Sequence, residues 1–386
     1  MRRSVDRILT THCGSLPRPR DLLDLMKARV EGQPHDEAAY AARVRSAVAD
    51  VVRKQLECGI DVPTDGEQGK PGFFAYVRER LAGFEPRPRA HSPGWAREVA
   101  AFPEYYEQYF SRRMLGGSIT GGTRLACTGP VAYRGEEALR RDLDNLQAAL
   151  TGQSPAEVFV PAVAPSGVGR NEHYRTDEEY LFAVAEAMHT EYRAIVDAGF
   201  LVQIDDPFLT DVYADPTLEG AAVTKKAELY VEAVNHGLQG IPPDRVRFHT
   251  CYGINEGPRV HDAPLAAILD VMLRVNAQAY SFEAANPRHE HEYHLFERVR
   301  LPEGKILIPG VITHASNIVE HPELIAERIG RYARLVGREN VMAGADCGFS
   351  SQATYNPEVH PTVVWAKFQA MAEGARLATR QLWGKG

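Results

Sequence analysis

The sequence lacks the usual features of a protein that binds nucleic acid or membranes. Acidic residues outnumber basic ones, 51 to 44, so the formal net charge is -7 at pH 7, and the isoelectric point is about 6.1. An acidic chain repels a phosphate backbone, and we expect no nucleic-acid partner. No apolar run approaches the roughly 18 residues of a membrane span, and residues 1–7 lack the apolar stretch of a signal peptide. We therefore expect a cytoplasmic protein with no membrane partner.

Cysteine is scarce and scattered. The 386 residues include five cysteines, at irregular intervals: Cys13, Cys58, Cys127, Cys251 and Cys347. An odd, dispersed set excludes the dense disulfide framework of small secreted domains. It is more consistent with free thiols and metal ligands in a reducing compartment.

Apolar sequence with a regular pattern is abundant. Hydrophobic residues make up 44% of the chain and charged residues 25%, which is enough for a large core. Apolar, β-branched runs alternate with stretches of helical period, which predicts an α/β fold with parallel strands. We expect one catalytic domain, residues 1–386, folded as a single (β/α)8 TIM barrel with inserted loops. The expected strands are 8–13, 60–64, 124–128, 200–205, 246–251, 279–283, 306–312 and 341–346, and the expected helices 20–30, 37–58, 136–150, 177–198, 221–235, 263–275, 289–299 and 322–336.

A ninth apolar run is one too many for this barrel. We expect residues 158–163 to lie outside it, because Pro161 is unfavourable in a central strand. Insertions are expected at about 83–122 and 155–175. The first is too long for an ordinary barrel loop and is rich in proline and aromatic residues, including Trp95 and Phe110. It is either a lid over a site or an excursion that packs its rings on the barrel wall.

Candidate metal ligands lie at the ends of three expected strands. His249 and Cys251 are two residues apart, so on a strand they point to the same face and can bind one ion together. Glu283 and Cys347 each follow another apolar run, and converging strand ends are where barrel enzymes place their sites. One imidazole, two thiols and one carboxylate suit a tetrahedral Zn²⁺. The simpler alternatives are cysteines that only pack and a histidine that only forms hydrogen bonds.

Six blocks in sequence order resemble the catalytic barrel of the cobalamin-independent methionine synthases, over most of the chain. They are Thr-Thr-His-Cys-Gly-Ser-Leu-Pro at 10–17, Asp-Gly-Glu at 65–67, Thr-Gly-Pro at 128–130, Gln-Ile-Asp-Asp-Pro at 203–207, the four candidate ligands, and Pro-Gly-Val at 309–311 followed by His314. The chain is most similar to a short, single-barrel branch of this family, which is related to epoxyalkane:coenzyme M transferase.

The resemblance implies a zinc-dependent thiol S-alkyltransferase, most simply a methyltransferase that converts homocysteine to methionine. A free thiol with a pKa of about 8.5 is mostly protonated at neutral pH, and coordination to the metal deprotonates it for attack. The implied site comprises Zn²⁺ ligands His249, Cys251, Glu283 and Cys347; Glu67 and Asp205 at the ammonium of homocysteine; Gly14 and Ser15 at its carboxylate; and His314 as the acid that protonates the departing group.

The alkyl donor is left open, with methylfolate, a methylcorrinoid protein and an epoxide as candidates. We expect no counterpart of the second barrel of full-length methionine synthases, and Tyr133 lies near the position of their pterin-stacking tryptophan. In an epoxide-opening enzyme, an arginine such as Arg18, Arg170 or Arg288 would bind the sulfonate of coenzyme M. Two further alternatives are a zinc-free barrel like uroporphyrinogen decarboxylase and a purely structural zinc protein.

Single residues of the implied site also have structural alternatives. Glu67 and Asp205 can pair with arginines or lysines of the barrel. The glutamate of the metal set can orient the histidine instead of binding the ion, and His314 can be a structural residue at a helix start. Cys13 ends the first expected strand, where it either packs in the core or adds a further sulfur to the site.

Overall fold

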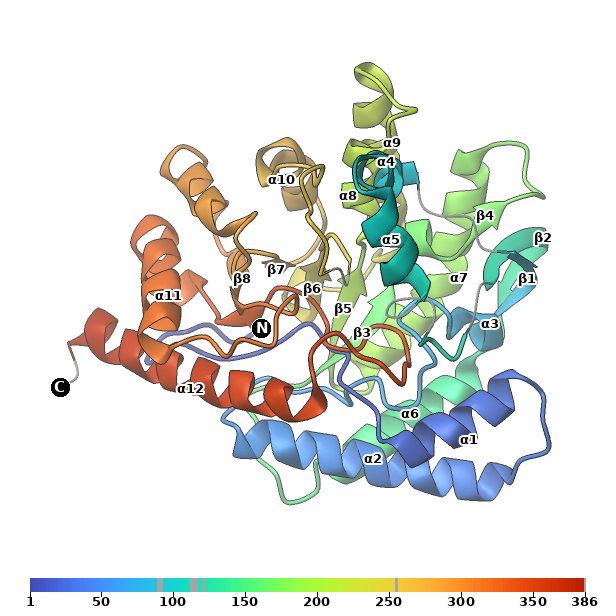
Figure 1. The fold of residues 1–386 in the computed structure, drawn as a ribbon, viewed down its shortest axis with the longest axis horizontal. Helices are drawn as coiled ribbons and strands as arrows, with labels where there is room; N and C mark the ends of the chain where they lie inside the picture. The colour runs from blue at the N-terminus through green and yellow to red at the C-terminus, as the bar shows by residue number, and fades with distance from the viewer. Residues whose placement is uncertain (89–92, 112–116, 121–122, 254–255, 385–386) are drawn as a thin grey trace.

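The fold is a parallel barrel surrounded by helices (Figure 1). The computed structural model describes residues 1–88, 93–111, 117–120, 123–253 and 256–384. Every residue of the barrel sheet is buried, because helices cover its outer face and side chains fill its interior. The sheet has the order β3 (Phe159–Val163), β5 (Leu201–Asp205), β6 (Val246–His249), β7 (Ala279–Phe282), β8 (Ile306–Ile312) and β9 (Gly344–Ala345).

Two short segments near the N-terminus close the barrel. Thr10 forms a parallel bridge with Ala343, next to β9, and Thr11 forms one with Val62. The backbone N–H of Phe159 in β3 donates to the carbonyl of the residue after Val62, at 3.1 Å. These contacts complete a circuit of eight parallel segments, and the predicted (β/α)8 barrel is confirmed.

Long helices follow the barrel strands. Their buried faces have helical spacing, as with Ile325, Ile329 and Ala333 of α11. Side chains cap four of them: Asp36 accepts from two backbone N–H groups of α2, and Thr176, His321 and His360 each accept from one, in α7, α11 and α12. The long helices are α1 (Arg20–Val30), α2 (Glu37–Glu57), α6 (Glu136–Ala149), α7 (Asp177–Asp197), α9 (Ala221–Gly237), α10 (Leu265–Leu273), α11 (Pro322–Val336) and α12 (Pro361–Trp383).

Shorter helices fill the connections. The expected helix at 289–299 is a 3₁₀ helix, η5 (Glu290–Glu297), and α12 was not expected from the sequence. None of the helices in the described part of the chain has both the length and the apolar character that crossing a membrane requires. The remaining ones are α3 (Val77–Arg80), α4 (Ala96–Ala101), α5 (Pro103–Tyr109), α8 (Phe208–Ala214), η1 (Pro93–Trp95), η3 (Pro165–Gly167), η4 (Pro243–Arg245) and η6 (Arg338–Asn340).

The prediction for the third barrel strand was wrong. Residues 158–163 supply it, as β3, whereas 124–128 belong to β2 (Thr123–Tyr133), which lies outside the barrel between antiparallel β1 (Leu81–Pro88) and parallel β4 (Arg170–Asn171). Alternate residues of a strand direct their N–H groups to the same side. The nitrogen of Pro161 is therefore on the side where Phe159 meets residue 63, and the β3–β5 ladder needs no N–H from it. The expected insertion at 155–175 thus begins with a barrel strand.

The expected insertion at 83–122 contributes β1, α4 and α5. The carboxylate of Glu98 on α4 accepts hydrogen bonds from the backbone N–H groups of Val260 and His261, in the connection after β6. Trp95 and Phe110 stack with their ring centroids 5.8 Å apart. Residues 93–111 therefore both pack their aromatic side chains and lie over the end of the barrel where the strands finish (Figure 1).

Candidate metal centre

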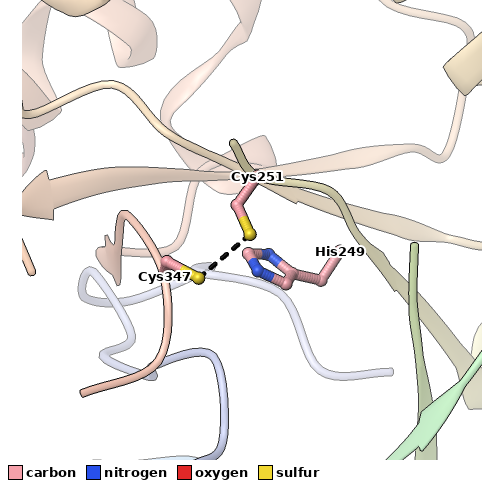
Figure 2. A group of neighbouring side chains, drawn as sticks. All are labelled: His249, Cys251 and Cys347. Atoms are coloured by element: carbon pink, nitrogen blue, oxygen red, sulfur yellow. Dashed lines mark hydrogen bonds between the residues drawn. The ribbon is translucent and has the colours of Figure 1, made fainter. Parts of the chain in front are cut away.

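Three predicted ligands meet at the carboxyl ends of β6 and β9. His249 ends β6, Cys251 follows two residues later, and Cys347 lies two residues beyond β9. Their ligand atoms all lie within 4.8 Å of one another, and the two sulfurs are 3.0 Å apart. Figure 2 shows the thiol groups pointing toward each other beside the imidazole ring. The spacing inferred from the sequence thus places one nitrogen and two sulfurs around a common point.

The donor atoms of this trio fit a thiophilic cation. Nδ1 of His249 lies 3.2 Å from Ser281 Oγ, and its buried Nε2 has no hydrogen-bond partner among the described residues. Burial and nearby Arg247 lower the pKa of His249 to about 3, so the ring is neutral and can act as a ligand. The hydrogen bond to Cys347 and burial raise the pKa of Cys251. A neutral imidazole and two cysteine sulfurs, which bind as thiolates, are donors that Zn²⁺ favours when three protein ligands leave a fourth position open.

The fourth predicted ligand, Glu283, lies next to the trio but is not part of it. Its Oε2 accepts hydrogen bonds from Arg259 Nη2 at 2.7 Å and from Asn286 at 2.9 Å, and its Oε1 accepts one from the backbone N–H of Tyr252 at 2.8 Å. Burial raises the pKa of Glu283, and Arg259 opposes the shift. The carboxylate is held by three donors in a buried setting.

Glu283, His314 and Asp346 form a second compact group of possible ligands. Asp346 accepts two backbone N–H bonds at 2.7 Å, and His314 Nε2 lies 3.0 Å from the carbonyl of Gly253. The guanidinium of Arg259 already supplies the positive charge, so a metal cation is disfavoured there. We interpret this group as a polar network. Burial and Arg259 lower the pKa of His314 to about 4.

A cavity of about 140 Å³ opens above the trio. The trio lines its base, together with Cys13, whose thiol donates to the carbonyl of Ala345 at 3.0 Å. Burial and Cys347 raise the pKa of Cys13, so this thiol is protonated. Aromatic side chains form much of the remaining wall: Phe73, Phe74, Trp95, Phe110, Phe208, Tyr252 and Phe349.

The two predicted ammonium-binding acids both line the cavity. Burial and Glu67 raise the pKa of Asp205 well above its usual range, and Asp205 accepts a hydrogen bond from Gln203 at 2.8 Å. Glu67 has a backbone φ of 54°, an unusual value for a residue with a side chain. Lys70 was missed from the sequence: its buried Nζ lies 3.5 Å from Glu67 and donates to Pro161 O at 2.6 Å. Its only sequence signal is the spacing of three residues from Glu67.

Of the predicted carboxylate-binding pair, the structure brings only Ser15 to the cavity. Ser15 Oγ lies 3.3 Å from Ser351 Oγ, and both residues line the wall. The backbone N–H of Gly14 donates to His12 Nδ1 at 3.2 Å, so it is already used. Gly14 has a φ of 127°, and a Cβ there would lie 2.6 Å from Pro161 Cγ. Its role is to let the turn pass close to β3.

The other residues considered from the sequence lie away from the cavity. Tyr133 donates to Glu191 at 2.9 Å, so it is not placed to stack on a donor. Arg18 donates to three backbone carbonyls, Arg170 pairs with Glu172, and Arg288 donates to two carbonyls. Arg124, which was not considered, is the described arginine that does line the cavity.

Comparisons with known proteins identify the family of this chain. Residues 161–367, more than half of the chain, match the model of the family described as cobalamin-independent synthase, catalytic domain. A methionine synthase of Thermococcus kodakarensis is 24% identical over 383 residues, covering 98% of this chain and 95% of its own, and one of Saccharolobus solfataricus is 25% identical over 383 residues, covering 98% and 96%.

Solved structures share the fold. A B12-independent methionine synthase from Shewanella sp. W3-18-1, in complex with selenomethionine, superposes with a TM-score of 0.72 at 18% identity, covering 98% of this chain and 99% of its own. A putative vitamin-B12 independent methionine synthase from Listeria monocytogenes gives 0.66 at 18% identity, covering 96% and 98%. With the family match over the segment that carries the trio, these relationships place the chain in the cobalamin-independent synthase family.

Proposed function

We propose that this protein is a zinc-dependent S-methyltransferase that converts homocysteine to methionine. The observation that carries the proposal is the position of the trio at the base of a cavity that also contains Glu67 and Asp205. The names of the relatives, which are methionine synthases, point to the same acceptor. We assign Zn²⁺ to His249, Cys251 and Cys347, with Glu283 as a fourth, exchangeable ligand. Five buried free cysteines agree with the reducing cytoplasm as its location.

The metal would supply one function, the conversion of the substrate thiol to a thiolate at neutral pH. The protein residues then have to orient that sulfur. The two cysteines and the histidine come from the ends of two strands, which are rigid supports. The contact between Ser281 Oγ and Nδ1 of His249 fixes the orientation of the ring, and Nε2 is then the nitrogen available to a metal.

The amino group of homocysteine would be bound by Glu67 and Asp205. Burial beside Glu67 raises the pKa of Asp205, and a substrate ammonium at these two acids would supply the positive charge that favours their ionised forms. We place the substrate carboxylate near the hydroxyl of Ser15, and assign Gly14 to shaping the turn that presents Ser15. Coenzyme M has no amine, so nothing in this arrangement favours it over homocysteine.

His314 is our candidate for the residue that protonates the leaving group. It is buried behind Gly253, and its Nδ1 has no hydrogen-bond partner among the described residues. Because the ring is neutral at pH 7, we expect it to take up and pass on a proton only during turnover. Replacement His314→Asn should then lower kcat and leave the KM for homocysteine and the zinc content unchanged.

The donor would occupy the aromatic part of the cavity. Phe73, Phe74 and Phe208 form one group of rings on this wall, with Phe73 and Phe208 stacked at 6.2 Å. Such a wall suits a flat donor, so methylfolate and a methylcorrinoid protein are the donors that we propose to test. For the epoxide reaction with coenzyme M, the three arginines considered for the sulfonate are engaged elsewhere, and Arg124 on the cavity wall is the described arginine that would have to bind it.

The test is turnover of purified, zinc-loaded protein with homocysteine and each methyl donor. Glu67→Gln and Asp205→Asn should each raise the KM for homocysteine by at least about 30-fold, because a buried charge loses its partner, and should leave the zinc content unchanged. Glu290→Gln is the control, since Glu290 pairs with Arg328 and Arg331 outside the cavity. Methylation of homocysteine that is indifferent to zinc or to both acids would refute the proposal.

A further inference from the structure

The carboxylate of Glu283 has a specific partner that the sequence did not indicate. Arg259 Nη2 lies 2.7 Å from Glu283 Oε2, and the side chains are 3% and 0% exposed. In such a buried pair, loss of either partner leaves an uncompensated charge away from water, which is strongly unfavourable. Glu283 is therefore fixed by a full positive charge at the edge of the trio.

Arg259 is itself positioned by its surroundings. Its Nε donates to Asp262 at 2.8 Å, and its guanidinium lies 5.5 Å from the ring centroid of Tyr252. Its backbone has a φ of 58°, which costs energy for a residue with a side chain and persists only where neighbours enforce it. Arg288 supplies such a constraint, because it donates to the carbonyl of Arg259 at 3.0 Å. The guanidinium is thus held in a fixed position beside the Glu283 carboxylate.

The Glu283 carboxylate lies next to the backbone of the residue that follows Cys251, one of the proposed metal ligands. The N–H of Tyr252, the residue after Cys251, donates to Glu283 Oε1. Two thiolates and a neutral imidazole balance the charge of Zn²⁺, so a fourth anionic ligand brings the centre to -1. Glu283 and a substrate thiolate each supply that charge, and both together would supply one too many for a buried site.

We infer that Arg259 is a positioning residue that receives the Glu283 carboxylate when the substrate thiolate takes the fourth position at the metal. This inference rests on the proposed function, because it needs a metal bound to His249, Cys251 and Cys347. The charge at the metal itself would stay at -1, because the thiolate would replace the carboxylate there, and the displaced carboxylate would be neutralised by Arg259. Arg259 thus determines how readily Glu283 leaves the fourth ligand position of the metal.

The experiment is a double-mutant cycle on metal and thiol affinity, with wild type, Arg259→Gln, Glu283→Gln and the double variant. Zn²⁺ affinity is measured by competition with a chelator, and homocysteine affinity from the thiolate band of the Co²⁺-loaded protein. In Arg259→Gln, the freed Glu283 carboxylate should raise the Zn²⁺ affinity about tenfold. It should lower the homocysteine affinity by a similar factor, because the carboxylate and the thiolate compete for one position. Arg259→Lys, which keeps the charge, should fall between wild type and Arg259→Gln.

The cycle separates this mechanism from simple charge removal. Loss of any nearby positive charge favours a cation, but that effect would persist in the Glu283→Gln background, whereas the proposed effect should vanish there. Arg80→Gln is the control for stability, since Arg80 is a buried arginine paired with Glu191 and Asp142 away from the metal. Equal effects of Arg259→Gln in both backgrounds would overturn the inference. Wild-type protein that binds neither Zn²⁺ nor homocysteine would instead overturn the proposed function.

Discussion

At the scale of single residues, the site depends on buried charges that are compensated in pairs. His289 is one example, between Asp262 at 3.1 Å and Glu292 at 2.8 Å. Its ring stacks on Tyr252 with centroids 4.2 Å apart. Burial alone would lower the pKa of His289, but hydrogen bonds to the two carboxylates raise it to about 9. A charged imidazole therefore helps to hold Asp262, which in turn holds Arg259.

This arrangement predicts a defined loss of stability at alkaline pH. The pKa of His289 is higher in the folded than in the unfolded chain, so its contribution is complete below pH 6.5 and disappears as the pH rises to about 9. A shift of this size corresponds to about 3 kcal/mol. Thermal unfolding of wild type and His289→Gln between pH 6 and 10 measures it. The difference in melting temperature should shrink with rising pH, and a constant difference would contradict the assignment.

The residues of the trio could be predicted from the sequence, but their neighbours could not. His249 and Cys251 follow from strand alternation, and Cys347 from an apolar run that ends at the same edge. Arg259 approaches Glu283 from a connection between elements, with a backbone conformation that no local pattern specifies. Lys70 lies beside Glu67 because the loop after the second barrel segment forms a turn in which the backbone N–H of Lys70 donates to the carbonyl of Glu67.

At the scale of secondary structure elements, the antiparallel β1–β2 pair shows why the assignment of the third barrel strand was wrong. Residues 124–128 are as apolar as a barrel strand, but β2 pairs with β1 and places Arg124 at the cavity. Strand propensity is determined by packing partners, which sequence patterns do not identify. Helix boundaries were more accurate, because side-chain caps such as Asp36 and Thr176 are local signals.

Gly83 should be essential for this pair. It lies at a register shift between Ala82 and Phe84, with a φ of 86°, and a Cβ there would lie 2.5 Å from the carbonyl oxygen of Pro130. Gly83→Ala should therefore destabilise the protein by about 2 kcal/mol or more. Gly152→Ala is the matched control, because Gly152 has a φ of 76° but no atom within 4 Å of the added carbon. Equal melting temperatures for the two variants would contradict the predicted steric clash.

At the scale of the whole molecule, the core of the barrel is separate from the proposed metal ligands. The trio lies at the carboxyl ends of β6 and β9, whereas the core is made of strands buried along their whole length and of helices such as α11 and α12 that pack together. Closure of the circuit by the short segments around Thr10 and Val62 uses backbone bridges in which none of the three ligands takes part. Alternation of strands and helices was sufficient to predict this architecture.

Removal of the metal should consequently abolish activity without unfolding the chain. Protein treated with a chelator is expected to keep its far-ultraviolet circular dichroism and to melt at a lower temperature, by the amount that metal binding contributes through linkage. Zn²⁺ added back should restore both melting temperature and activity. Loss of secondary structure in the chelator would mean that the ion is structural.

The central claim is that the trio holds a metal to which a homocysteine sulfur binds. The most direct measurement is the absorption spectrum of the Co²⁺-loaded protein during titration with homocysteine, with coenzyme M and glutathione as comparisons. We predict that the thiolate-to-cobalt band rises with homocysteine alone and that Glu67→Gln weakens the response. No change with any of these thiols would contradict the claim and would mean that the metal site is closed to substrate.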